Sequence, residues 1–219
     1  MEEIDRLTGD FALQRAIEET NEISKVLPQI QDKLKILEAA MTYISVGETE
    51  QGDVPEESYG YIPLDLGHYF ECLFDLETAL VNDKDYRDPD LRHRRVSFVE
   101  AGCGSGRNVF LLKVTDRFEF GTVQGFDLSK PLIDHGRRVF GLGKDIFTGD
   151  CMKFDYAPFD VIYFYRPFSD HDKELAFEDQ LVKSMKKGAY IIGCGNLSLS
   201  DDRRLLEKCD NGRIYKKLN

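Results

Sequence analysis

Several features that would place a protein in a membrane, a secreted class or a metal-binding class are missing from this sequence. No apolar run approaches the roughly 18–20 residues that a membrane-spanning helix needs. The first residues, MEEID, lack the basic and then apolar layout of a signal peptide. The five cysteines are odd in number, widely spaced and form no C-x-x-C pair. We therefore expect a cytoplasmic protein with reduced thiols, no membrane association and no bound metal.

Positive charge is also scarce. Lys and Arg number 29 against 40 Asp and Glu, which gives a net charge of −11. Proteins that bind duplex nucleic acids depend on cations to neutralise phosphates, so this balance disfavours a nucleic-acid partner. An acidic enzyme would instead attract a basic protein by long-range steering. The four histidines form no convincing Ser-His-Asp or Cys-His set, while 42% hydrophobic residues suffice for a globular core.

The first 58 residues differ from the rest of the chain. Apolar residues recur there at alternating spacings of four and three, at Ile23, Leu27, Ile30, Leu34, Leu37, Met41 and Ile44. This spacing is typical of a coiled-coil seam, but an amphipathic helix packed on its own domain would show it too. Residues 47–60 are acidic and rich in turn formers, as in a linker. We predict an N-terminal helical arm and linker over 1–58, which allows a homodimer, and a catalytic domain over 59–219.

From residue 96 onward, short apolar runs alternate with helical patterns. The predicted strands are 96–100, 123–126, 145–147, 161–165, 190–194 and 213–217, and the predicted helices between them are 108–115, 130–140, 172–187 and 201–208. Such alternation predicts an α/β fold with a doubly wound, mostly parallel sheet. Because only one strand can be placed after residue 194, we expect six strands or a sheet that is incomplete at its C-terminal end.

The strongest chemical signal is the segment EAGCGSG at residues 100–106, which joins a predicted strand to a predicted helix. Its glycines let the backbone pass close to a ligand, and the start of the helix offers unpaired N–H groups. Dinucleotide-binding loops need G-x-G-x-x-G, but Arg107 stands where their third glycine would be. This departure weakens the hypothesis of a nicotinamide-dependent oxidoreductase without removing it.

The same segment resembles the first motif of the class I S-adenosylmethionine-dependent methyltransferases, E-x-G-x-G-x-G, and the resemblance extends over residues 58–195. Asp127 and Asp150 follow the next two strands, as the acids of the later motifs do in that family. The resemblance implies a Rossmann-like methyltransferase fold with S-adenosyl-L-methionine as cofactor. It implies that Glu100 and the glycine loop hold the methionine moiety, Asp127 the ribose and Asp150 the adenine. The cofactor-binding residues expected on this basis are Tyr61, Glu100, Gly102, Cys103, Gly104, Gly106, Asp127, Leu128, Asp150 and Cys151. A structural alternative remains for the acids, since an Asp after a strand often caps the next helix.

The methyl acceptor should lie beside the segment YRPF at residues 165–168, after the fourth strand. Nucleobase and glutamine amino methyltransferases carry Asn/Asp-Pro-Pro-Tyr/Phe there, so this chain lacks their side-chain amide or carboxylate. We expect Tyr165 and Arg166 to flank the acceptor, although Tyr165 packed at a strand end is an equal alternative. The acceptor predicted is a protein side chain, for example lysine, or a small molecule. A catalytically silent S-adenosylmethionine-binding scaffold remains a further alternative.

Overall fold

The computed structural model describes residues 35, 37–41, 43, 55–60, 62, 65–88, 93–115, 120–209 and 212–218. The chain divides into two compact units, Met1–Ala40 and Met41–Asn219. In the first unit the described residues are helical. Most of the heptad positions lie outside the described residues, so the coiled coil and the homodimer stay predictions. All that follows concerns the second unit.

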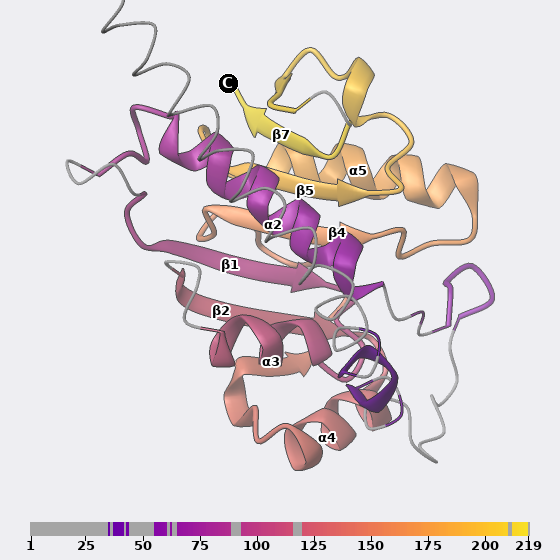
Figure 1. The fold of residues 1–219 in the computed structure, drawn as a ribbon. Helices are drawn as coiled ribbons and strands as arrows, with labels where there is room; N and C mark the ends of the chain where they lie inside the picture. Colours follow the sequence, from indigo (N-terminus) through magenta and orange to yellow (C-terminus); the bar gives the residue numbers. More distant parts are fainter. Residues whose placement is uncertain are drawn as a thin grey trace, which may run out of the picture. The chain divides into compact units, whose positions relative to one another are not determined.

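Seven strands of the second unit form one sheet in the order β3-β2-β1-β4-β5-β7-β6 (Figure 1). They are β1 (Val96–Ala101), β2 (Phe120–Asp127), β3 (Ile146–Thr148), β4 (Val161–Tyr165), β5 (Tyr190–Cys194), β6 (Leu205–Glu207) and β7 (Ile214–Lys217). The pairs from β3 across to β5 are parallel, and β7 is antiparallel to both β5 and β6. The predicted doubly wound, mostly parallel sheet is therefore confirmed.

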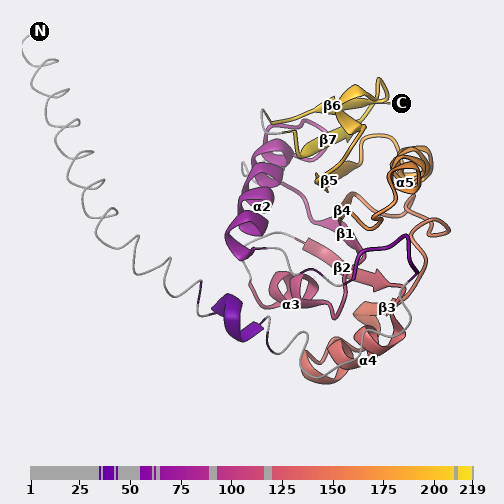
Figure 2. The same ribbon diagram turned by 90° about the vertical axis from the view of Figure 1, so that its right-hand side faces the viewer.

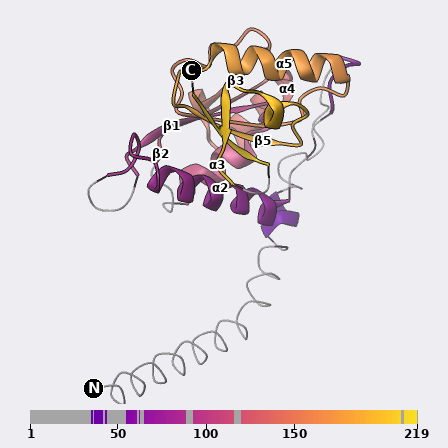
Figure 3. The same cartoon turned by 90° about the horizontal axis from the view of Figure 1, so that it is seen from above.

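The central strands are buried on both faces, because helices cover each side of the sheet. The helices are α2 (Leu66–Val81), α3 (Arg107–Val114), α4 (Lys130–Val139) and α5 (His171–Ser184). On one face Leu73 of α2 and Val109 of α3 belong to the same buried cluster as Phe98 of β1. On the other face Phe177 of α5 belongs to a cluster with Val99 of β1. Figures 2 and 3 show α2 and α5 on opposite sides of the sheet. No helix among the described residues is both long enough and apolar enough to cross a membrane.

The C-terminal part of the sheet differs from the prediction. The predicted helix over 201–208 is wrong: a short 3-10 helix (Leu199–Asp201) and then β6 occupy this stretch, so the sheet has seven strands rather than six. Arg204 is fixed to Asp202, which accepts from the backbone N–H and from the side chain of Arg204. The next residues pair with β7 in a hairpin. A three-residue strand that depends on its partner leaves no periodic signal in the sequence.

Helix α4 and the glycine loop after β1 approach each other backbone to backbone. A Cβ atom added at Gly136 of α4 would lie 1.8 Å from the Ser105 carbonyl oxygen. Only glycine fits at this contact, and it places the second half of α4 against the loop that begins the candidate site.

The Gly136 contact gives a first prediction. Gly136→Ala should lower the free energy of unfolding by about 3 kcal/mol, because backbone must move to admit the methyl group. In the matched control Gly121→Ala, on β2, the new Cβ meets Arg95 Cβ at 3.5 Å and the Val96 carbonyl oxygen at 3.8 Å, which is ordinary contact. Chemical denaturation of both variants measures the difference, and equal stabilities would contradict the close packing.

Candidate functional site

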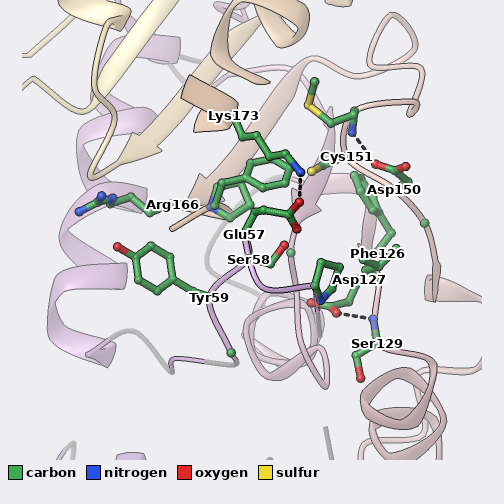
Figure 4. A pocket seen from close by; sticks show the side chains of 18 of the residues that line it. Glu57, Ser58, Tyr59, Phe126, Asp127, Ser129, Asp150, Cys151, Arg166 and Lys173 are labelled. Carbon is green, nitrogen blue, oxygen red and sulfur yellow. Dashed lines mark hydrogen bonds and ion pairs between the residues drawn. The ribbon is translucent and has the colours of Figure 1, made fainter. Parts of the chain in front are cut away.

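A cavity of about 330 Å³ opens at the carboxyl ends of the parallel strands (Figure 4). Its wall is made by the loops after β1, β2, β3 and β4, together with a segment that precedes α2. The carboxyl edge of a doubly wound sheet is the usual place for a ligand. The predicted site residues in the wall are Gly102, Asp127, Leu128, Asp150, Cys151 and Arg166.

Other predicted site residues do not line the cavity, and Tyr61 is outside the described residues. Glu100 and Cys103 are buried, and neither is part of the cavity wall. Gly104 and Gly106 shape the loop but are also not in the wall, and Tyr165 has a side chain that is 39% exposed. Five of the predicted residues that the structure describes therefore lie outside the cavity wall.

The glycine loop owes its shape to left-handed backbone. Gly102, Gly104 and Gly106 have φ values of 75°, 56° and 78°, which side-chain-bearing residues rarely adopt. The N–H groups of Gly102 and Cys103 both donate to the Phe126 carbonyl oxygen at 2.9 Å, which fixes the loop against the end of β2. The G-x-G-x-G pattern is thus a backbone requirement of this turn.

Asp127 ends β2 and joins two loops. Its Oδ2 accepts from the Gly104 N–H and its Oδ1 from the Ser129 N–H, each at 2.8 Å. A carboxylate oxygen can accept more than one hydrogen bond, so each oxygen retains capacity for a ligand. Burial raises the pKa of Asp127 above its ordinary value. The cap of the next helix, α4, is Ser129, whose hydroxyl oxygen accepts from the Leu132 N–H at 3.3 Å. Asp127 therefore does not cap this helix; it holds the residue that does, and it lines the cavity.

Asp150 and Cys151 follow β3 on the same wall. The carboxylate of Asp150 accepts from the Met152 N–H at 2.9 Å and pairs with Lys153 at 2.8 Å. The hydrogen bond from Lys153 lowers the pKa of Asp150, which keeps the carboxylate ionised. Burial raises the pKa of the Cys151 thiol to about 12, so this cysteine contributes an uncharged surface and no nucleophile.

Glu100 has a structural environment rather than a ligand-facing one. Its Oε1 accepts from Asn108 Nδ2 of α3 at 2.8 Å, which ties the end of β1 to that helix. Its Oε2 has no hydrogen-bond partner in the described part of the chain. Burial raises the pKa of Glu100 to about 8, so the carboxyl group is largely protonated at neutral pH.

The segment 55–60, which we call the strap, lies along one side of the cavity. Ser58 forms an antiparallel bridge with Phe168, and the Ser169 N–H donates to the Glu57 carbonyl oxygen at 2.9 Å. The Glu57 carboxylate pairs with Lys173 of α5 at 2.6 Å. Residues on both sides of the predicted boundary at residue 58 therefore line the cavity. In the sequence, the acidic residues and Pro55 of this segment did not predict these contacts.

The turn after β4 contains strained backbone. Arg166 has a φ of 35°, and its guanidinium carbon lies 5.4 Å from the centre of the Tyr59 ring of the strap. Figure 4 shows Tyr59 and Arg166 on the side of the cavity away from Asp127 and Asp150. A non-glycine residue in this region costs roughly 1–3 kcal/mol and is often found at functional sites.

Two buried glutamates of α5, which the sequence analysis missed, hold the loops at this edge of the sheet. Glu174 accepts from the Phe168 N–H at 3.0 Å, and burial raises the pKa of this carboxyl group to about 7. Glu178 accepts from the N–H groups of Leu197 and Ser198 at 2.6 and 2.7 Å. In the sequence the two glutamates are four residues apart on the apolar face of a predicted helix, and this spacing could have indicated them.

Comparison with known proteins finds matches by structure and none by sequence. No model of a known protein family matches the chain, and a comparison with curated protein sequences finds no match. Solved structures do match. A proposed RNA methyltransferase from Pyrococcus horikoshii, PH1948, is 14% identical, with 86% of this chain and 100% of that chain covered and a TM-score of 0.52.

Further matches are more distant. An RNA methyltransferase from Salinibacter ruber, solved with S-adenosyl-L-homocysteine, is 14% identical over 72% of this chain and 92% of that one, with a TM-score of 0.46. A proposed sarcosine dimethylglycine methyltransferase from Galdieria sulphuraria is 13% identical over 59% of this chain, with a TM-score of 0.44. The chain spans 46% of the length of this Galdieria protein.

The strand order and the match to the Pyrococcus structure define the fold class. The chain has the seven-strand, Rossmann-like fold of the class I S-adenosylmethionine-dependent methyltransferases. At this level of identity the match concerns the fold, and function has to be argued from the site.

Glu100 gives a prediction about stability and pH. Its folded pKa of about 8 exceeds the ordinary value of 4.5, so between these values the folded protein holds a proton that the unfolded chain releases. This group therefore makes the protein less stable as pH rises through that window. Glu100→Gln should flatten the dependence of stability on pH. The gain in free energy of unfolding caused by this substitution should be about 1–3 kcal/mol larger at pH 8 than at pH 5. Thermal unfolding from pH 5 to 8 tests this, and parallel curves for the two proteins would contradict it.

Proposed function

We propose that the protein is an S-adenosylmethionine-dependent methyltransferase whose cofactor occupies the cavity at the carboxyl edge of the sheet. The observation that carries the proposal is the convergence of two acids from neighbouring strand ends, Asp127 and Asp150, on one cavity beside the glycine loop. In this proposal Asp127 accepts from the ribose hydroxyls and Asp150 from the adenine amino group.

The residues present fit this cofactor. A Cβ atom added at Gly102 would meet nothing within 4 Å, so the backbone borders open space where the methionine moiety would pass. Asp127 keeps acceptor capacity on both oxygens, as two adjacent ribose hydroxyls require. The thiol of Cys151 and the side chains of Phe126 and Leu128 supply apolar wall for an adenine ring.

S-adenosylmethionine, when bound, supplies an electrophilic methyl group for in-line displacement. The chain's own contribution is then to align an acceptor with that methyl group and to keep water out. Such positioning is worth about 7–11 kcal/mol, and it requires no acid–base pair. The strap and the turn at residues 166–168 would do this, since both line the cavity and bond to each other. Arg166, and Tyr165 beside it, would flank the acceptor.

The acceptor that we propose is a protein side chain, for example lysine, or a small molecule. The net charge of −11 and the absence of a side-chain amide or carboxylate in the YRPF turn support this choice. Two of the structures that this fold matches are described as RNA methyltransferases, so RNA must be one arm of the test.

The direct test is incubation of the purified protein with S-adenosylmethionine labelled in its methyl group and a cell lysate. Label recovered in protein or in small molecules, and absent with Asp127→Ala, is the expected result. Label in RNA would overturn the acceptor class and leave the enzyme class standing. Binding of S-adenosylhomocysteine without transfer indicates a silent scaffold, and binding of NAD in its place indicates an oxidoreductase.

Asp127 carries the prediction for cofactor affinity. Asp127→Ala should weaken S-adenosylhomocysteine binding by tenfold or more, because loss of a charged hydrogen-bond acceptor costs about 1.5–3 kcal/mol. Calorimetric titration measures the change. Asp134→Ala, which removes an exposed carboxylate of α4 paired with Lys130, is the matched control and should leave affinity unchanged. Because Asp127 also holds two loops, the variant Asp127→Asn checks whether the affinity falls without unfolding of the protein. Unaltered affinity in both Asp127 variants would refute the assignment of Asp127 to the cofactor site.

The strap gives a separate prediction about cofactor release. Lys173→Met removes the ion pair with Glu57 and should speed dissociation of S-adenosylhomocysteine about two- to fivefold, as expected for an exposed pair worth up to about 1 kcal/mol. Stopped-flow measurement gives the rate. Lys183→Met breaks the pair with Asp179 on the same helix, away from the cavity, and should not change it. Equal rates in both variants would mean that the strap does not retain the cofactor.

A further inference from the structure

Three side chains that commonly bind metals converge outside the cavity, between α2 and the end of β5. They are His68 and Cys72 of α2 and Cys194, the last residue of β5. One donor atom of each lies within 4.8 Å of the others. Both cysteines are buried, while the His68 side chain is 37% exposed, so the group has a route to solvent on one side.

The helix brings further donors to the same place. His68, Glu71 and Cys72 stand at positions i, i+3 and i+4, which share one face of an α-helix. Cys194 is 122 residues away from Cys72 and meets it only through the packing of α2 on the sheet. A search for closely spaced cysteines cannot find such a group, which is why the sequence predicted no metal.

The spacing of the two sulfur atoms is that of a tetrahedral zinc site. With Zn–S bonds of about 2.3 Å and Zn–N or Zn–O bonds of about 2.1 Å, a tetrahedron has S···S edges of about 3.8 Å and N···O edges of about 3.4 Å. The two Sγ atoms are 3.5 Å apart, and His68 Nδ1 lies 3.7 Å from Glu71 Oε2. The S···S spacing agrees with the ideal edge to about 0.3 Å, and the N···O spacing shows that His68 and Glu71 are already neighbours.

Arg213 shows that these donors already face a positive charge. Its Nη1 lies 3.1 Å from His68 Nδ1, 3.6 Å from Cys72 Sγ and 3.5 Å from Glu71 Oε2. A zinc ion with two thiolates and one carboxylate carries a net charge of −1. Zinc and Arg213 cannot share the lone pair of His68 Nδ1, so the guanidinium would leave His68 and neutralise this charge from the second coordination sphere, beside Cys72 and Glu71. The charge that accompanies the two buried thiolates is then balanced.

We propose that His68, Glu71, Cys72 and Cys194 form a structural zinc site, with Arg213 as its counter-ion. Zinc binding releases the two thiol protons to solvent and leaves the oxidation state of both sulfurs unchanged. Glu71, which is 66% exposed, rotates inward to complete the tetrahedron. The ion clamps α2 to the end of β5, directly before Gly195. A Cβ atom at Gly195 would lie 2.8 Å from Arg166 Cγ, so the clamp also supports the turn that faces the proposed acceptor.

Cobalt(II) titration of the metal-free full-length protein, kept reduced with a phosphine, tests the proposal. One equivalent should produce thiolate-to-cobalt charge-transfer absorption and the intense visible bands of tetrahedral cobalt, both abolished by zinc. Cys72→Ser, Cys194→Ser and His68→Gln should each weaken binding by at least about 100-fold. The control Cys209→Ser, a cysteine of the chain outside this cluster, should bind as the unchanged protein does.

A second readout separates metal binding from misfolding of a variant. Zinc should raise the thermal midpoint of the unchanged protein and of Cys209→Ser, and leave that of His68→Gln unaltered. His68 is partly exposed, so this variant keeps the buried packing of the two cysteines. The absence of charge-transfer absorption at one equivalent, or its persistence in Cys72→Ser and Cys194→Ser, would overturn the proposal.

Discussion

The Asp127 carboxylate is the contact on which the geometry of the cavity depends. One oxygen holds Gly104 of the loop after β1, and the other holds Ser129 at the start of α4. Gly136 of the same helix touches the backbone of Ser105, so loop and helix are fixed to each other at two points. A single half-buried acid therefore sets the shape of the cavity and offers a ligand its remaining lone pairs.

The opposite side of the cavity depends on α5. Glu174 and Glu178 place two carboxyl groups among apolar side chains, and each accepts from the backbone of a loop that follows a strand. Burial of such groups is costly unless they are hydrogen-bonded, so their bonds to the loops order both helix and loop. Lys173 of the same helix then joins this side to the strap. One helix thus positions the turn, the strap and the loop after β5.

The sequence predicted those parts of the molecule whose signal is local. Apolar runs marked the central strands, and Asp127 and Asp150 could be assigned to one edge because acids that follow parallel strands meet there. The β6 strand was missed because it depends on pairing with β7. The strap and the His68–Cys72–Cys194 group were missed because they join residues far apart in the chain. Glu174 was missed although the Phe168 N–H that it accepts from is only six residues away. The burial of Glu100 could not be predicted because a motif gives the position of a residue and not the direction of its side chain.

The central claim is that this chain holds S-adenosylmethionine between Asp127 and Asp150. The most direct measurement is a crystal structure of the protein grown with S-adenosyl-L-homocysteine. We predict both ribose hydroxyls within hydrogen-bond distance of the Asp127 carboxylate and the adenine amino group beside Asp150. An adenosine moiety bound elsewhere, or a cavity that stays empty at saturating ligand, would contradict this account.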